Sequence, residues 1–123
     1  MKILIIDDDP LIAEMYTLKL KEAGFDVEVA TDGRAGLEKI KGGNYDVVLL
    51  DVVLPIMDGF EILQSLQREG KSPPPVILLT NLGQKEDVDR GMALGAVDYV
   101  IKAHFTPTEV VAKIQAVLKK AQS

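Results

Sequence analysis

The stretch Asp46–Asp51, which reads DVVLLD, places four consecutive apolar residues between two acidic ones. An uninterrupted run of valine and leucine of this length is typical of a strand buried on both faces of a parallel sheet. Nearly continuous apolar runs also occupy Lys2–Asp7 and Val76–Thr80. A further apolar segment, Val97–Lys102, is interrupted by Asp98, and apolar and polar residues alternate over Phe25–Val29. The sequence therefore predicts five strands.

Helical patterns separate these strands, and a further one follows the last of them. The first helix is expected to begin at Pro10, with Asp9 as its N-cap and Gly24 after its end. The others are expected over Ala35–Lys41, from Asp58 as N-cap to Gly70, over Lys85–Leu94, and after a capping box that begins at Thr106. This alternation predicts an α/β fold, a (βα)5 three-layer sandwich with helices on both faces of a parallel sheet.

Length, charge and composition narrow the classes of function. A chain of 123 residues suits one domain with a single core, so we expect residues 1–123 to form one domain with no effector domain in this chain. The chain has no cysteine, which excludes disulfides and thiol catalysis, and its net charge of −5 without a basic patch argues against direct nucleic acid binding. The longest apolar runs, such as Val47–Leu50, are too short for membrane insertion, and we expect a cytoplasmic location.

Polar side chains end four of the five predicted strands, namely Asp7 with Asp8, Asp51, Thr80 and Lys102. In an open parallel sheet, ligands bind outside the carboxyl ends of the strands, where the strand order reverses. With the flavodoxin-like order 2-1-3-4-5 that point lies between the first and third strands, so these side chains are expected to converge on one crevice. Crowded carboxylates repel one another, and a hard cation such as Mg²⁺ (or Mn²⁺) would relieve that repulsion. A carboxylate nucleophile, a metal, a lysine and a hydroxyl together suit phosphoryl transfer.

The sequence resembles the CheY-like receiver domains of two-component response regulators over essentially its whole length. The segments that carry the resemblance are Ile6–Pro10, Leu50–Gly59, Leu79–Thr80 and Asp98–Lys102. Their joint occurrence, in order and at the spacing of the family, makes the resemblance specific. It implies a receiver that takes a phosphoryl group from a histidine kinase or a histidine phosphotransfer protein. It also implies at most self-phosphorylation and slow autodephosphorylation, not a turnover enzyme.

The resemblance assigns a role to each residue at the strand ends. It implies that Asp51 is the phosphoacceptor, that Asp8 binds the metal directly, and that Asp7 acts largely through water. The backbone carbonyl of Val53 would complete the protein ligands of the metal, and Lys102 would serve catalysis beside Asp51.

The same resemblance implies how a signal leaves the domain. Thr80 would move toward the phosphoryl group and the ring of Tyr99 would follow, so that the two residues form a switch pair. A downstream protein partner would bind a face formed by residues 85–120.

The chain departs from the family pattern at three places around this site. Ala103 follows Lys102 where the family has a proline after a cis peptide bond, and a cis bond to a non-proline residue costs about 2.5–4 kcal/mol. The loop after it looks one residue longer than usual, and we expect the extra residue to let a trans chain keep Lys102 aimed at Asp51. Asn81 stands where the family favours a smaller residue and would narrow access to the phosphoryl group.

The positions that tune dephosphorylation in the family, Val53 and Leu82, are both apolar here. Neither side chain can orient an attacking water by hydrogen bonding, which predicts a long-lived phosphorylated state.

Other interpretations of the same residues stay open. A degenerate receiver, acting as a phosphorylation-independent interaction module, is favoured by the altered Lys102–Ala103 loop and opposed by the intact acidic residues. A phosphatase of the haloacid-dehalogenase type would need a second acid where Val53 stands, and a flavin binder would need a phosphate loop where Asp7 begins an acidic run. His104, the single histidine, is interpreted as a loop residue, and Asp9 and Asp58 as helix caps.

Overall fold

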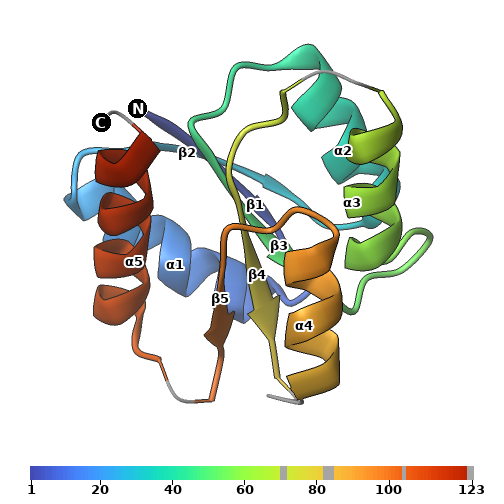
Figure 1. The fold of residues 1–123 in the computed structure, drawn as a ribbon. Helices are drawn as coiled ribbons and strands as arrows, with labels where there is room; N and C mark the ends of the chain where they lie inside the picture. Colours follow the sequence, from blue (N-terminus) through green and yellow to red (C-terminus); the bar gives the residue numbers. More distant parts are fainter. Residues whose placement is uncertain (70–71, 82–84, 104, 122–123) are drawn as a thin grey trace.

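Five strands and five helices alternate along the chain (Figure 1). The computed structural model describes residues 1–69, 72–81, 85–103 and 105–121. The strands are β1 (Lys2–Ile6), β2 (Asp26–Ala30), β3 (Val47–Asp51), β4 (Val76–Thr80) and β5 (Asp98–Ile101). The helices are α1 (Pro10–Glu22), α2 (Gly33–Gly42), α3 (Gly59–Arg68), α4 (Lys85–Ala93) and α5 (Pro107–Ala121). The strands pair in parallel in the order β2-β1-β3-β4-β5, which confirms the predicted fold and strand order.

The sheet is a middle layer between two groups of helices. Helices α1 and α5 cover one face, and α2, α3 and α4 cover the other (Figure 1). Alternate residues of β1, β3 and β4 enter one or the other of two apolar clusters, because successive side chains of a strand point to opposite faces. Burial on both faces explains why these three strands are apolar without interruption. Among the described helices, none has the length and apolar character that crossing a membrane requires.

Side-chain caps set where the helices begin. Asp9 accepts hydrogen bonds from the first backbone amides of α1, and Asp58 accepts one from Glu61 N at 2.9 Å, so both are caps as predicted. Thr106 and Glu109 form the predicted capping box of α5.

Helix α2 begins two residues before the predicted start at Ala35. The cap is Asp32, whose carboxylate accepts a hydrogen bond from Ala35 N at 2.8 Å. The apolar pattern alone could not reveal the first turn, because it begins with Gly33 and Arg34, which lie outside that pattern.

A charged network ties the edge strand β2 to its neighbours. Glu28 pairs with Lys2 at 2.6 Å and with Lys39 of α2 at 3.1 Å. The hydrogen bonds from Lys2 and then Lys39 lower the pKa of Glu28 from 4.5 to about 2. All three side chains remain partly exposed, so solvent screens the pairs.

Replacing Glu28 with glutamine is expected to lower the melting temperature slightly near neutral pH and to have no effect near pH 2. The carboxylate has a lower pKa in the folded state, so its contribution is complete above pH 4.5 and is lost as the pH falls toward about 2. Thermal unfolding of both proteins across this range measures the difference, with the exposed Glu14→Gln as control. A difference in melting temperature that is independent of pH would contradict the assignment.

Candidate functional site

The carboxyl ends of β1 and β3 bring three aspartates together. The two strands are neighbours, with Ile6 opposite Leu50, so the residues that follow them, Asp7 and Asp51, end side by side. One carboxylate oxygen from each of Asp7, Asp8 and Asp51 lies within 4.8 Å of the others. Asp7 and Asp51 are buried, with 0% and 6% exposure, whereas Asp8 is open to solvent. The structure therefore brings these three aspartates together at the carboxyl ends of β1 and β3, as predicted.

Lys102 enters this cluster from the end of β5. Its Nζ lies 2.7 Å from Asp7 Oδ2 and 2.8 Å from Asp51 Oδ2, and its side chain is only 6% exposed. None of the described peptide bonds is cis, so the chain from Lys102 to Ala103 is trans. The expectation that a trans chain keeps Lys102 aimed at Asp51 agrees with this geometry.

Backbone amides fix the second oxygen of each buried carboxylate. Asp7 Oδ1 accepts a hydrogen bond from Asp9 N at 2.9 Å, and Asp51 Oδ1 accepts one from Val53 N at 3.1 Å. Each carboxylate is thus held between an amide on one oxygen and the Lys102 ammonium on the other. This arrangement sets the orientation of both acids.

The site carries more negative than positive charge. Burial raises the pKa of Asp51, the hydrogen bond and charge of Lys102 oppose that rise, and the charge of Asp7 adds to it. Burial alone would lower the pKa of Lys102, but the hydrogen bonds and charges of Asp51 and Asp7 outweigh burial and raise it. Among the described residues, the cluster holds three carboxylates and the ammonium of Lys102, which pairs with two of them, so the donor set suits a divalent cation with oxygen ligands.

Thr80 and Tyr99 lie on adjacent strands and on the same face of the sheet. Thr80 ends β4 and is 4% exposed. Tyr99 lies opposite Leu78 in the register and packs, half-buried, against the same apolar cluster as Leu78. Because Thr80 is two residues after Leu78, its side chain shares the face on which the Tyr99 ring lies.

The remaining predicted residues follow the ends of β3 and β4 or lie outside the described part of the chain. Val53 is 68% exposed, and Asn81 is exposed directly after Thr80. Leu82 and His104, both singled out from the sequence, lie outside the described residues.

Tyr16 of α1 is a neighbour of the site that the sequence did not reveal. It is 4% exposed, and burial is the main cause that raises the pKa of its hydroxyl. The charge of Lys102 opposes this rise, and the charges of Asp7 and Asp51 add to it, which places the ring within electrostatic reach of the cluster. In the sequence Tyr16 only continued the apolar face of a helix, and no motif distinguished it from a core residue.

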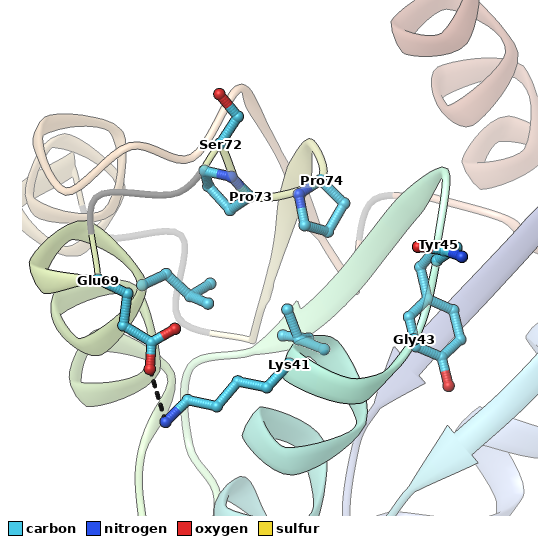
Figure 2. Close-up of a pocket in the computed structure, with 10 residues that line it drawn as sticks. Lys41, Gly43, Tyr45, Glu69, Ser72, Pro73 and Pro74 are labelled. Carbon is cyan, nitrogen blue, oxygen red and sulfur yellow. Dashed lines mark ion pairs between the residues drawn. The ribbon is translucent and has the colours of Figure 1, made fainter.

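A separate pocket lies at the opposite end of the sheet, between the C-terminal ends of α2 and α3 (Figure 2). Its volume is about 610 Å³, and the ion pair of Lys41 with Glu69, at 2.7 Å, crosses one side of it. Tyr45, Pro73 and Pro74 also line it. None of the residues at the carboxyl ends of the strands contributes to it, so it is not part of the acidic site.

A parallel sheet in the order 2-1-3-4-5, with an acidic cluster and a lysine at its carboxyl ends, defines the receiver class of signalling domain. The chain belongs to the response regulator receiver domain family, whose family model matches residues 3–115. It is therefore a receiver domain of two-component response regulators.

Individual relatives agree with this assignment. Over 120 residues the chain is 40% identical to the DNA-binding dual master transcriptional regulator RpaA of Synechocystis, covering 97% of this chain and 49% of that protein. The chain thus spans about half the length of the curated relatives it matches.

Solved structures of receiver domains agree with the family assignment. The receiver domain of the Francisella response regulator 1452 superimposes with a TM-score of 0.90 at 34% identity, covering 98% of both chains. The BeF3-activated DrrB receiver domain superimposes with a TM-score of 0.83 at 35% identity, covering 96% of this chain and 97% of that one.

Proposed function

We propose that this receiver accepts a phosphoryl group on Asp51 from the phosphohistidine of a histidine kinase or a histidine phosphotransfer protein. The observation that carries the proposal is the buried pairing of Lys102 Nζ with both Asp7 and Asp51, at 2.7 and 2.8 Å, beside the exposed Asp8. An acceptor carboxylate, acidic metal ligands and a fixed cation are the parts that phosphoryl transfer requires.

The metal ligands in this proposal are Asp8, Asp51 and the backbone carbonyl of Val53, with Asp7 acting largely through water. The fit rests on the surplus negative charge of the cluster and on its all-oxygen donor set. Bound there, Mg²⁺ (or Mn²⁺) would neutralise charge on the carboxylates and on the phosphoryl oxygens.

Asp51 acts as the nucleophile in the proposed transfer. One of its carboxylate oxygens forms a bond to phosphorus while the bond from phosphorus to the donor's imidazole nitrogen breaks, and the imidazole leaves with the electron pair. The hydrogen bonds from Val53 N and Lys102 Nζ hold the Asp51 carboxylate in one orientation, which reduces the entropic cost of reaching the transition state. Lys102 can also balance charge that develops on the phosphoryl group.

The switch in this proposal is the pair Thr80 and Tyr99. The Thr80 hydroxyl would hydrogen-bond a phosphoryl oxygen, and the Tyr99 ring, on the same face of the sheet, would follow it. Phosphorylation would then favour one of two pre-existing conformations. Output would pass to a protein partner through the face formed by residues 85–120, while exposed Val53 and Asn81 would tune access and lifetime together with Leu82.

Two relatives support this proposal. DrrB is described as a receiver domain activated by BeF3, a mimic of the phosphoryl group, and RpaA as a DNA-binding regulator. Residues 1–123 would form the receiver unit, with no effector domain among them, and would transmit the phosphorylation state by protein contact.

Thermal unfolding of the wild type and of Asp51→Asn, without ligand, with Mg²⁺, and with Mg²⁺ plus beryllofluoride, tests the proposed function. Mg²⁺ is expected to raise the melting temperature of the wild type, and beryllofluoride to raise it further, because ligands that bind only the folded state stabilise it. At a ligand concentration of 100 Kd the added stability is about 2.7 kcal/mol. Asp51→Asn should lose the beryllofluoride increment.

The matched control is Asp89→Asn, which removes the same charge from an exposed position of α4. It should respond to both ligands as the wild type does. A wild type that responds to neither ligand would refute phosphorylation at Asp51 and would favour a degenerate receiver that binds partners without phosphorylation.

A further inference from the structure

A lysine of α5 lies at the edge of the sheet and contacts the residues around Tyr99. Lys113 Nζ is 2.8 Å from Asp98 Oδ1, 5.3 Å from the centre of the Tyr99 ring, and 5.4 Å from the centre of the Phe105 ring. Strand β5 is the last strand of the sheet, so its outer edge has no neighbouring strand among the described elements. The lysine thus places a positive charge between a carboxylate and two aromatic rings.

These contacts connect the two faces of the sheet. Phe105 packs against the apolar cluster under α1 and α5, whereas Tyr99 packs against the cluster under α2, α3 and α4. Lys113 reaches both rings from α5, and Asp98 Oδ1 also accepts a hydrogen bond from the backbone amide of Tyr99 at 2.8 Å. The ammonium group is therefore linked to both the backbone and the ring of Tyr99.

Partial burial makes these contacts stronger than ordinary surface pairs. The side chains of Lys113 and Asp98 are 26% and 32% exposed. A cation near an aromatic face gains more as it loses water, and a carboxylate on its other side holds it in place. Moving the Tyr99 ring away would cost this contact.

We propose that Lys113 is a positioning residue that holds the Tyr99 ring beside α5 at the edge of the sheet and so opposes its movement toward Thr80. The inference rests on the proposed function, in which Tyr99 follows Thr80 when Asp51 is phosphorylated. A contact present in only one of two conformations shifts their equilibrium by its own free energy. Loss of the Lys113 charge should therefore make the phosphorylated conformation easier to reach.

Lys113→Met keeps most of the aliphatic stem and removes the charge, whereas Lys113→Arg keeps the charge. With Mg²⁺ present, Lys113→Met is expected to bind beryllofluoride roughly three- to tenfold more tightly than the wild type, as measured by titration calorimetry. Lys113→Arg should bind close to the wild-type affinity. Lys119→Met, which removes the same charge from an exposed position of α5, is the matched control and should also match the wild type.

A double-mutant cycle with Tyr99→Leu separates positioning from simple support of α5. If Lys113 acts through the Tyr99 ring, Lys113→Met should leave the beryllofluoride affinity of Tyr99→Leu unchanged, because the contact is already lost. In NMR spectra, the ε-methylene signals of Lys113 should show a ring-current shift that disappears when beryllofluoride binds to the wild type.

The possible failures are distinct. Lys113→Met with wild-type beryllofluoride affinity and a lower melting temperature would show that Lys113 only supports α5, and would overturn the inference while leaving the proposed function intact. Asp98→Asn removes the carboxylate that pairs with the Lys113 ammonium and leaves Lys113 itself unchanged. Like Lys113→Met, it should bind beryllofluoride more tightly than the wild type. A wild type that binds no beryllofluoride would refute the proposed function, and the inference would fall with it.

Discussion

Replacing Lys102 with methionine is expected to lower the free energy of unfolding by about 3–5 kcal/mol in the absence of divalent cations. The Lys102 ammonium group pairs with Asp7 and Asp51, whose side chains are both buried. Without it, two carboxylates remain buried next to each other with only one backbone hydrogen bond each in the described structure. The cost of an uncompensated buried charge exceeds the value of the pair itself.

The loss of unfolding free energy in Lys102→Met should be largest at neutral pH and smaller at acidic pH. The pKa of Asp51 is already raised in the folded state, and removing the lysine raises it further. A carboxyl whose pKa is higher in the folded state binds protons more tightly there, so stability recovers as the pH falls through that raised pKa. Urea unfolding of both proteins between pH 7 and pH 4 measures this recovery.

Mg²⁺ should stabilise Lys102→Met more than it stabilises the wild type. In the wild type a cation has to compete with the ammonium for Asp7 and Asp51, and in the variant that competition is gone. Lys119→Met serves as control for the loss of one charge. A Lys102→Met protein as stable as the wild type without metal would show that the lysine does not neutralise the site.

Replacing Gly33 with alanine is expected to lower the free energy of unfolding by about 3 kcal/mol or more. A Cβ atom on Gly33 would lie 1.7 Å from the backbone oxygen of Met57, so the first turn of α2 and the loop after β3 would have to separate. The clash involves backbone on both sides, and rotation of a side chain cannot relieve it. The higher helix propensity of alanine, about 1 kcal/mol, does not offset this cost.

Gly42→Ala is the matched control because it makes the same change in the same helix. No atom lies within 4 Å of the Cβ that alanine would add at Gly42, and the substitution should be neutral or slightly stabilising. Urea unfolding of both variants compares them directly. Wild-type stability of Gly33→Ala would mean that α2 and the loop before α3 do not approach as closely as described.

Much of the fold could be predicted from local sequence patterns. The apolar runs that become β1, β3 and β4 are buried on both faces, and the caps Asp9 and Asp58 mark where helices begin. These signals lie within a few residues of the structure they specify, so they can be recognised without knowing any distant contact.

The site could be predicted in outline for a related reason. The carboxyl ends of parallel strands meet at one edge of the sheet, so Asp7, Asp51 and Lys102 had to converge once the strand order was right. Their roles in phosphoryl transfer stay a prediction that the unfolding experiments test.

Contacts between distant parts of the chain were decided only by the tertiary structure. Only the tertiary structure shows that Lys102 pairs with two carboxylates, that Tyr16 is buried within electrostatic reach of them, and that Lys113 contacts the Tyr99 ring. It also made Gly33 necessary, because Met57 approaches it from another loop. Strand and helix periodicity determines which face of an element is buried, but packing determines which side chains from different elements finally meet, and no local pattern in this sequence encodes that choice.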